Sequence, residues 1–288
     1  MKSVVVTLLG GLGNQMFQYA MGRALSIRLA LPLVLDISML RFRTNAYTPR
    51  DYELGCFRLS GQRLRDTPVW FFRARNTVGR WLVSQGIDST RFITEQSLQF
   101  DPEMLQVNGP CHLQGHWLCE RYFESIAAQL REDFAFLPAP PARSLEYESQ
   151  IRGVKSVGAH FRRGDFTDRP FPGQCSEDYY RSALEMVASR LGGDLELFVF
   201  SDDIDWCRQN VRHPLPTTFV DLRGIAPPFE ELRLMSACRA FVMANSTFSW
   251  WAGWLNPRPD KVVIAPRHWI QVPGYVCELP NSPWLTAI

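Results

Sequence analysis

Two adjacent arginines, Arg162 and Arg163, are the residues of this chain whose types and spacing point most directly to chemistry. They follow the apolar run 156–159, which predicts a buried strand that ends in the segment 160–165. Guanidinium groups a few ångströms apart repel each other and cannot lose their protons, so a phosphate or diphosphate would stabilise them. A carboxylate such as that of Asp165 would also stabilise them, so the pair by itself leaves a ligand site and a structural role open.

Two further polar clusters follow predicted strands in the second half of the chain. Asp202 and Asp203 come after the predicted buried strand 196–200, and a hydroxyl-rich helix start comes after the run 240–244. The carboxyl ends of parallel strands meet at one edge of the sheet, where open α/β sheets bind their ligands. Hydroxyl and N–H groups at a helix N-terminus suit phosphate oxygens. The three clusters together predict a nucleotide-diphosphate pocket, to which the third contributes Asn245, Ser246, Thr247 and Ser249.

The acidic pair Asp202–Asp203 has two other interpretations. It could hold Mg²⁺, but arginines beside a diphosphate already supply the neutralising charge. Capping a helix or orienting an arginine is therefore the favoured role. The sequence has no GxxxxGK[ST] motif, and its seven cysteines form no CxxC pair, so neither a P-loop enzyme nor a metal site is predicted.

The N-terminal segment predicts a strand, a glycine-rich turn and a helix. The run 4–9 is apolar, the sequence Gly10-Gly11-Leu12-Gly13-Asn14-Gln15 follows it, and the residues up to 29 have helical spacing. Such a turn brings a phosphate or sugar close to backbone N–H groups. A dinucleotide site, with Asp36 on the ribose, is a competing interpretation. It is disfavoured because Met16 stands at the third glycine position.

Length, composition and the order of elements limit the fold. The 288 residues, of which 46% are hydrophobic, are enough for two modest domains. The proline-rich stretch 137–142 is the clearest linker and divides the chain into domains 1–140 and 141–288. Alternating strands and helices predict an α/β fold with parallel, doubly wound sheets. The net charge of +2 gives no support to nucleic-acid binding.

The expected elements differ in how clearly the sequence marks them. In the second half, helices are expected at 176–191 and 229–237, and strands at 157–161, 196–200, 218–221, 240–244 and 262–266, the last of the chain. In the first half, a helix is expected at 120–134, and strands at 4–9, 32–35 and 111–117. The stretch 66–100 predicts only loops and short helices. His116 beside Trp117 could hold a sugar, although a packed histidine is favoured.

The cysteines and the apolar runs indicate where the protein resides. The seven cysteines are an odd number without disulfide-like spacing, which indicates reduced thiols in the cytoplasm. No apolar run approaches the roughly 20 residues of a membrane helix, and the start has no signal-peptide layout. A cytoplasmic protein is therefore expected. Attachment to the inner face of the membrane stays open, as does the oligomeric state.

Four segments carry a resemblance to a known family. They are Gly10-Gly11-Leu12-Gly13-Asn14-Gln15-Met16-Phe17-Gln18-Tyr19-Ala20, His160-Phe161-Arg162-Arg163-Gly164-Asp165, Phe200-Ser201-Asp202-Asp203 and Ala244-Asn245-Ser246-Thr247-Phe248-Ser249-Trp250-Trp251-Ala252-Gly253-Trp254-Leu255. Shorter matches are Tyr52-Glu53-Leu54 with Phe57, and Leu113-Gln114-Gly115 with Tyr122-Phe123. In this order the segments resemble the bacterial α-1,2-fucosyltransferase family, and they run nearly from end to end of the chain.

The resemblance implies a fold and an activity. The fold is GT-B, with two facing Rossmann-like domains: an acceptor-side domain (1–140) and a domain that binds GDP-β-L-fucose (141–288). The activity is inverting transfer of L-fucose to the 2-hydroxyl of a terminal β-galactoside, with no metal or other cofactor, in the building of bacterial surface glycans. The partners implied are GDP-fucose and a galactose-terminated glycan. A fucosyltransferase of another linkage and a nucleotide-binding module without turnover are the alternatives.

In the C-terminal half, the resemblance gives roles to residues of the motifs. Arg162 would neutralise the β-phosphate as the donor breaks, with support from Arg163. His160 and Asp202 are expected beside the nucleotide. Glu231 would accept hydrogen bonds from guanine N1 and N2.

The remaining roles concern the reacting sugar and the acceptor. Asn14, next to Gly13, would reach the diphosphate or the fucose, and Asp165 is the candidate general base that inversion requires. Two departures from the family pattern lie in the first half: Gly55 replaces an expected acid, and His116-Trp117 replaces a more usual Tyr-Phe. The resemblance therefore specifies the donor better than the acceptor.

Overall fold

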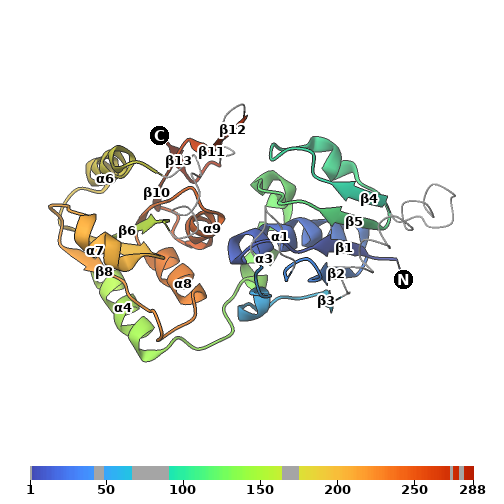
Figure 1. Ribbon diagram of the computed structural model, residues 1–288, viewed down its shortest axis with the longest axis horizontal. Coiled ribbons are helices and arrows are strands. Elements are labelled where there is room, and N and C mark those ends of the chain that lie inside the picture. The colour runs from blue at the N-terminus through green and yellow to red at the C-terminus, as the bar shows by residue number, and fades with distance from the viewer. Residues whose placement is uncertain (1, 42–48, 67–90, 164–174, 273–274, 279–281) are drawn as a thin grey trace. The chain divides into compact units, whose positions relative to one another are not determined.

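The computed structural model describes residues 2–41, 49–66, 91–163, 175–272, 275–278 and 282–288. By its internal contacts the chain divides into two compact units, Met1–Pro138 and Ala139–Ile288. The boundary lies in the proline-rich stretch of the sequence. Each unit has its own parallel sheet with helices packed on it (Figure 1).

The N-terminal unit is built on a five-stranded sheet of order β3-β2-β1-β5-β4. All four neighbouring pairs are parallel. The strands are β1 (Val4–Thr7), β2 (Leu33–Asp36), β3 (Gln62–Arg65), β4 (Arg91–Thr94) and β5 (Cys111–Gln114). The apolar strands β1, β2 and β5 occupy the centre, and each ends close to the position that its apolar run predicts. The edge strand β4 lies in the stretch 66–100, where the sequence indicates only loops and short helices, and the sequence predicts no strand at β3. Both strands are short and only partly buried.

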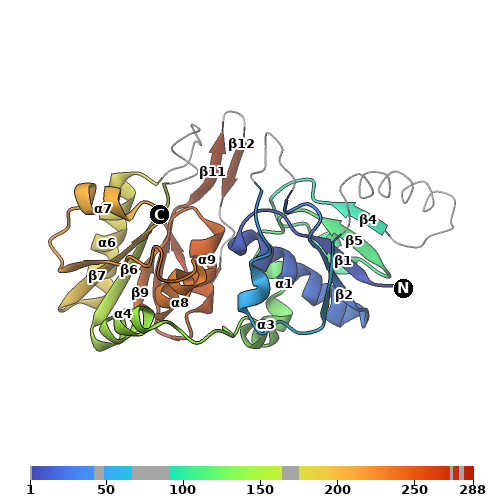
Figure 2. The same ribbon diagram turned by 60° about the horizontal axis from the view of Figure 1, so that its bottom comes forward.

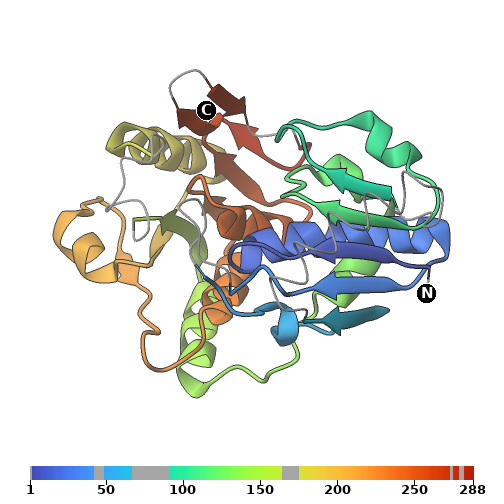
Figure 3. The same ribbon diagram turned by 45° about the vertical axis from the view of Figure 1, so that its right-hand side comes forward.

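Helix α1 (Leu12–Leu29) lies against the N-terminal sheet, as the blue helix in Figure 3 shows. Gly22 allows a close approach, because a Cβ at this position would lie 2.3 Å from Cγ2 of Val6. The helix expected at 120–134 is wrong in its first half: two short 3₁₀ segments, η3 (Glu120–Tyr122) and η4 (Glu124–Ile126), precede α3 (Ala127–Asp133). Two more 3₁₀ segments, η1 (Leu54–Cys56) and η2 (Pro102–Gln106), complete the described helical content of this unit.

The C-terminal unit contains a six-stranded sheet of order β13-β10-β9-β6-β7-β8, again with parallel pairs throughout. The strands are β6 (Lys155–Phe161), β7 (Leu195–Ser201), β8 (Thr217–Phe219), β9 (Ala240–Val242), β10 (Val262–Ala265) and β13 (Thr286–Ala287). The chain proceeds from β6 to one edge and then returns to the other side of β6 at β9. The point between β6 and β9 is therefore the topological switch point, where doubly wound sheets bind ligands.

Helices cover both faces of the C-terminal sheet (Figure 2). Residues of α6 (Glu177–Leu191) and α7 (Ile204–Asn210) share one hydrophobic core with β6, β7, β9 and β10. Helix α8 (Phe229–Ala237) packs against both α4 (Ala142–Gly153) and α9 (Thr247–Leu255). Gly158 of β6 allows the end of α8 to lie close to the sheet, because a Cβ there would lie 2.9 Å from Sγ of Cys238, the residue that follows α8. None of the helices in the described residues is both long and apolar enough to cross a membrane.

Several sequence predictions for this unit are confirmed and others are wrong. Helix α8 has the predicted bounds, and Ser176 caps α6 by accepting a hydrogen bond from the backbone N–H of Tyr179 at 3.1 Å. The prediction that 262–266 is the last strand is wrong, since the hairpin β11 (His268–Val272) and β12 (Tyr275–Glu278) and the edge strand β13 follow it. The stretch between the proline-rich linker and residue 155, for which no element is expected above, forms helix α4.

Candidate active site

The carboxyl ends of three neighbouring strands, β9, β6 and β7, carry the three polar clusters that the sequence marks. His160 of β6 and Ser249 of α9 contact each other across the switch point, through Nδ1 and Oγ. Ser249 is fully buried, and its hydroxyl also accepts a hydrogen bond from the backbone N–H of Ala244 at 3.3 Å. Tyr180 of α6 fixes the same strand end by donating to the carbonyl of His160 at 2.8 Å. Ser249 therefore positions His160, and the expectation that its hydroxyl receives a phosphate does not fit its burial.

His160 is neutral in this position. Burial, and then the nearby positive charge of Arg162, lower the pKa of the imidazole to about 4. A neutral imidazole has one N–H donor and one acceptor nitrogen. The positive charge at the end of β6 therefore comes from the arginines and not from His160.

Arg162 and Asp202 form an ion pair at the ends of the adjacent strands β6 and β7. The distance from Nη1 to Oδ2 is 2.7 Å, and the two side chains are 27% and 23% exposed. The other carboxylate oxygen, Oδ1, accepts the backbone N–H of Arg163 at 2.9 Å. Asp202 thus contacts both residues of the arginine segment, Arg162–Arg163, one with each carboxylate oxygen. Orienting an arginine is one of the two roles that the sequence favours for the acidic pair.

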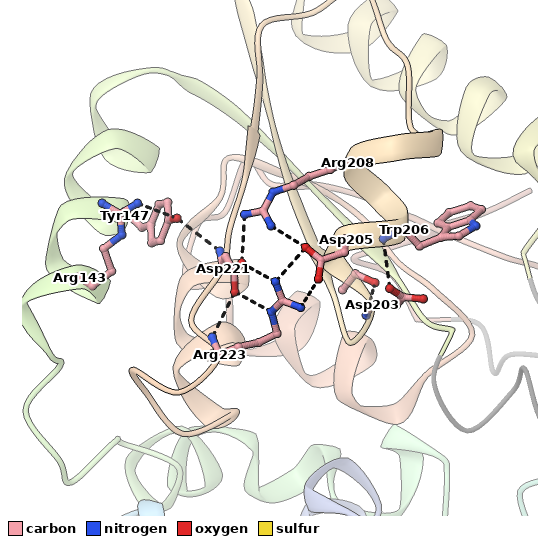
Figure 4. Close-up of polar contacts among 9 residues, drawn as sticks. Arg143, Tyr147, Asp203, Asp205, Trp206, Arg208, Asp221 and Arg223 are labelled. Atoms are coloured by element: carbon pink, nitrogen blue, oxygen red, sulfur yellow. Dashed lines mark hydrogen bonds and ion pairs between the residues drawn. The ribbon is translucent and has the colours of Figure 1, made fainter.

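Arg163 takes a different direction from Arg162. Its guanidinium carbon lies 3.6 Å from the ring centre of Trp206, in the first turn of α7. Its Nε is 3.7 Å from Oδ2 of Asp203. Asp203 in turn caps α7 by accepting the backbone N–H of Trp206 at 3.1 Å, a contact visible in Figure 4. The second role favoured for the acidic pair, helix capping, therefore belongs to Asp203.

Glu231, in the first turn of α8, has the electrostatic environment of a ligand-binding carboxylate. Burial raises its pKa to about 7, with further contributions from the negative charges of Asp202 and Asp221, while Arg162 lowers it. The Glu231 carboxyl therefore lies within electrostatic range of Asp202 and Arg162. A strongly shifted carboxyl beside a specific charge partner is typical of a functional site.

A network of four charged side chains holds the loop after β8, and the sequence analysis did not identify it (Figure 4). Asp221 of this loop pairs with Arg223 at 2.8 Å and with Arg208 of α7 at 3.0 Å. Asp205 of α7 pairs with the same two arginines, at 2.6 Å and 2.9 Å. The network ties α7 to the segment that leads into α8, and so to Glu231.

The start of α9 presents two kinds of polar residue. Asn245 is 8% exposed, donates from Nδ2 to the carbonyl of Trp269 at 3.4 Å, and accepts the thiol of Cys175 at 3.8 Å. Ser246 and Thr247 are partly exposed, and the Ser246 hydroxyl makes no capping hydrogen bond within α9. Of the hydroxyl-bearing residues proposed for phosphate, these two are the ones placed to meet a ligand.

In the N-terminal unit, the glycine-rich turn is held from inside by Gln15. Its Nε2 donates to the carbonyls of Gly10 and Asp51, both at 2.9 Å, and its Oε1 accepts the backbone N–H of Glu53 at 3.0 Å. The carboxylate of Glu53 accepts the Leu12 N–H at 3.2 Å, at the first residue of α1. A phosphate at this N–H would meet the Glu53 carboxylate, so the predicted anion site at the start of α1 does not fit.

Asn14 projects from the first turn of α1 beside Gly10. Gly10 has φ +73°, and a Cβ on it would lie 2.5 Å from Nδ2 of Asn14. Asn14 is partly exposed, whereas Gly13 is buried. The competing dinucleotide interpretation is wrong, because Asp36 is fully buried and accepts Nε of Arg65 at 2.9 Å instead of reaching a ribose.

The segment after β5 is a buried turn and not an open sugar platform. Trp117 is 1% exposed and has φ +58°, an unusual conformation for a bulky side chain. Glu95 holds the turn, accepting the backbone N–H groups of His116 at 2.6 Å and Trp117 at 2.9 Å. Trp117 therefore cannot stack on a sugar in this conformation.

Sequence comparison places this site in a family. The profile of Glycosyl transferase family 11 matches residues 87–274. An Alpha-1,2-colitosyltransferase of Escherichia coli is 33% identical over an alignment of 290 positions, which covers 94% of this chain and 93% of the relative. The chain belongs to glycosyl transferase family 11. The O-antigen biosynthesis glycosyltransferase WbnK of Escherichia coli is 30% identical over 91% of this chain and 93% of its own length.

More distant relatives agree with this family and its fold. Human Galactoside alpha-(1,2)-fucosyltransferase 1 is 24% identical over 146 residues, or 46% of this chain and 40% of the human protein. Among solved structures, a GDP complex of Arabidopsis thaliana FUT1 aligns with TM-score 0.53 and 11% identity, over 96% of this chain and 73% of that one. NodZ alpha-1,6-fucosyltransferase soaked with GDP-fucose aligns with TM-score 0.50 and 12% identity, over 98% and 100%. The family 11 member therefore has a GT-B fold, in which each of the two α/β units contains a parallel sheet.

Two expectations for this family 11 member remain untested at the site. Asp165, the candidate base, lies outside the described residues. Within the described ranges, no three His, Cys, Asp or Glu side chains come together as a metal site would require. Among the described residues, Arg162 and Asp202 form an ion pair at this edge of the sheet, His160 lies at the same strand end, and Glu231 lies within electrostatic range of the pair.

Proposed function

We propose that this family 11 member is an α-1,2-fucosyltransferase. It transfers L-fucose from GDP-β-L-fucose to the 2-hydroxyl of a terminal β-galactoside, with inversion at the anomeric carbon, in the synthesis of a bacterial surface glycan. The names of its bacterial relatives, an alpha-1,2-colitosyltransferase and an O-antigen glycosyltransferase, support the linkage and the pathway class. The name of the human relative supports fucose as the transferred sugar and a galactoside as the acceptor.

One observation carries the donor assignment: Arg162, at the switch point of the C-terminal sheet, lies within electrostatic range of the partly buried carboxylate of Glu231. Arg162 supplies fixed N–H donors at the end of β6, and Glu231 supplies an acceptor from α8. A guanosine diphosphate needs both groups, because its phosphates are anionic and its base edge carries two N–H donors. Uracil offers carbonyl oxygens at the corresponding edge, which a carboxylate repels.

The proposed mechanism assigns the main catalytic effect to Arg162. As the bond between fucose C1 and the β-phosphate breaks, positive charge grows on the sugar and negative charge grows on the phosphate oxygens. A preorganised guanidinium at that phosphate lowers the barrier because it costs no reorganisation at the moment of reaction. Asp202 holds Arg162 in place through the 2.7 Å ion pair, and neutral His160 lines the same strand end. Ser246 and Thr247 would add hydroxyl contacts to the phosphates.

The test is turnover with a defined product. The purified protein is incubated with GDP-fucose and each of lactose, N-acetyllactosamine and Gal-β-1,3-GalNAc, and GDP release and product linkage by NMR are followed. We expect fucose α-linked to galactose O2 with at least one acceptor. Fucose on another hydroxyl would overturn the linkage. GDP binding without release above the acceptor-free blank would favour a binding module instead.

A second candidate differs only in the donor sugar, because the 33% identical relative is named as a colitosyltransferase. Colitose is L-fucose without its 3-hydroxyl. A site that hydrogen-bonds this hydroxyl rejects the deoxy sugar strongly, whereas an apolar site discriminates weakly. Comparison of kcat/KM for GDP-fucose and GDP-colitose on one acceptor decides between them. A higher kcat/KM for GDP-colitose would replace the fucose assignment and leave the guanosine diphosphate assignment intact.

A further inference from the structure

Trp206 has no role in any motif of the sequence, yet it contacts the arginine segment directly. Its ring lies under the guanidinium of Arg163, with 3.6 Å between the ring centre and the guanidinium carbon. The remainder of the Trp206 side chain packs against the hydrophobic core that α6 and α7 share with the sheet. Asp203, at 3.7 Å from Nε of Arg163, lies beside the same guanidinium. Arg163 is thus held by contacts with Trp206, in the first turn of α7, and with Asp203, its N-cap residue.

This contact is continuous with Arg162 through the backbone and Asp202. The Arg163 N–H donates to Oδ1 of Asp202 at 2.9 Å, and Oδ2 of Asp202 pairs with Arg162 at 2.7 Å. A shift of the Arg163 main chain would therefore move the carboxylate that orients Arg162.

We propose that Trp206 is a positioning residue of the diphosphate site, acting through Arg163. Trp206 holds Arg163 on α7, so that Asp202 presents Arg162 to the donor. This inference rests on the proposed function, and it changes the role of Arg163 from a second phosphate ligand to an anchor. Trp206 suits the task because an indole face attracts a planar guanidinium more strongly than the ring of Tyr or Phe does.

The experiment uses Trp206→Phe, Trp206→Leu, Arg163→Met and the double variant Arg163→Met/Trp206→Leu. For each, kcat and KM for the donor, the Kd for GDP and the melting temperature are measured. Leucine fills space without a π face, so we expect Trp206→Leu to lower kcat about tenfold, which corresponds to about 1.4 kcal/mol. Phenylalanine keeps a weaker π face, so Trp206→Phe should retain most of the activity. Arg163→Met should cost about as much as Trp206→Leu, and the double variant little more than either.

Arg190→Met is the control, since Arg190 is an exposed arginine of the same unit that donates to Thr286 at 2.8 Å and touches none of these residues. It should leave kcat unchanged. A Trp206→Leu protein with a lower melting temperature but normal kcat would overturn the proposal. A much larger loss in Arg163→Met than in Trp206→Leu, undiminished when the two substitutions are combined, would make Arg163 a direct phosphate ligand and also overturn it.

If Trp206→Leu does not fold, Arg163→Lys tests the same contact from the other side, because lysine keeps the charge but loses the planar stacking. We then expect reduced kcat with an unchanged melting temperature, and a normal kcat would count against the proposal. A wild-type protein that neither binds GDP nor turns over any GDP-sugar would refute the proposed function, whereas active wild type with unaffected variants would refute only this inference.

Discussion

The guanidinium of Arg162 and the carboxylate of Asp202 form a 2.7 Å ion pair between the ends of two adjacent parallel strands. Both side chains are about a quarter exposed, so solvent still reaches the pair. Its importance lies in the direction that it gives to Arg162.

We expect Arg162→Ala to lower kcat by about 10²–10³ or more, the scale for loss of one preorganised donor. Arg162→Lys should restore little, because a point charge on a flexible stem does not reproduce the planar contact. Single-turnover rates and melting temperature are measured on the same preparation. Arg239→Ala, which removes a comparable surface pair with Asp260 at 3.1 Å, is the control. A destabilised but catalytically normal Arg162→Ala protein would show that Arg162 is purely structural.

The raised pKa of Glu231, about 7, makes nucleotide binding depend on pH. Only the ionised carboxylate can accept both guanine donors, so below pH 7 the free protein must release a proton to bind. From the ionised fraction we expect GDP affinity about tenfold weaker at pH 6 than at pH 8. Calorimetric titration of GDP into wild type and Glu231→Gln tests this, because titration of the phosphates themselves is common to both. The same pH slope in both proteins would contradict the assignment.

Glu231 also predicts the sign of one pH effect on stability. Its folded pKa of about 7 is above the ordinary value of 4.5, so between these values the folded state binds more protons than the unfolded state. The contribution of Glu231 to stability is therefore greatest below pH 4.5 and is lost as the pH rises towards 7. Glu231→Gln should remove this decline in denaturant unfolding measured across pH 4–8. A wild-type stability that rises with pH relative to Glu231→Gln would refute the sign.

Ser249 and Ser246 should respond differently to removal of their hydroxyls, although both belong to the same motif. Ser249→Ala leaves His160 and the Ala244 N–H without a buried partner, so we expect a loss of about 1–3 kcal/mol in the free energy of unfolding. Ser246→Ala should leave stability nearly unchanged and raise the Kd for GDP. Denaturant unfolding and GDP titration on both variants separate the roles. Equal stability of the two variants would contradict the positioning role of Ser249.

Gln15 should be a structural residue of the glycine-rich turn. Gln15→Leu removes two hydrogen bonds to carbonyls and one from the Glu53 N–H, so we expect a loss of about 1–3 kcal/mol in the free energy of unfolding. Asn14→Ala is the matched comparison, since Asn14 is partly exposed and the family resemblance implies that it reaches the diphosphate or the fucose. It should lower kcat with little change in the melting temperature. Reversal of these two outcomes would exchange the roles of the two amides.

The proposed neutralisation of the diphosphate by Arg162 predicts that no divalent cation is needed. Treatment with EDTA followed by gel filtration should leave kcat unchanged within experimental error, and added Mg²⁺ should not restore activity to Arg162→Ala. Loss of turnover on chelation, with recovery on Mg²⁺ addition, would require a cation at the diphosphate.

The central strands and the edge that carries the polar clusters could be predicted from the sequence. The run that leads to His160, the run before Asp202 and the run before Asn245 are each apolar over their length and polar at their ends, and they form β6, β7 and β9. A buried strand must be apolar wherever it lies in the sheet, so a local pattern is sufficient to find it. Strands β3, β4 and β13 lack such runs because edge strands are only half covered.

The sequence by itself determined which polar residues lie at the carboxyl edge of the C-terminal sheet, and only the tertiary structure decided what each of them does. Ser249 contacts His160, which lies 89 residues away in the chain, and its hydroxyl is therefore not available to a ligand. The carboxylate of Asp202 pairs with Arg162, whereas that of Asp203 caps helix α7. Arg163 rests on Trp206, which no motif marks. Residue types limit the contacts that a side chain can make, but the choice among them depends on which strand ends the crossover connections bring together, and no local pattern encodes that choice.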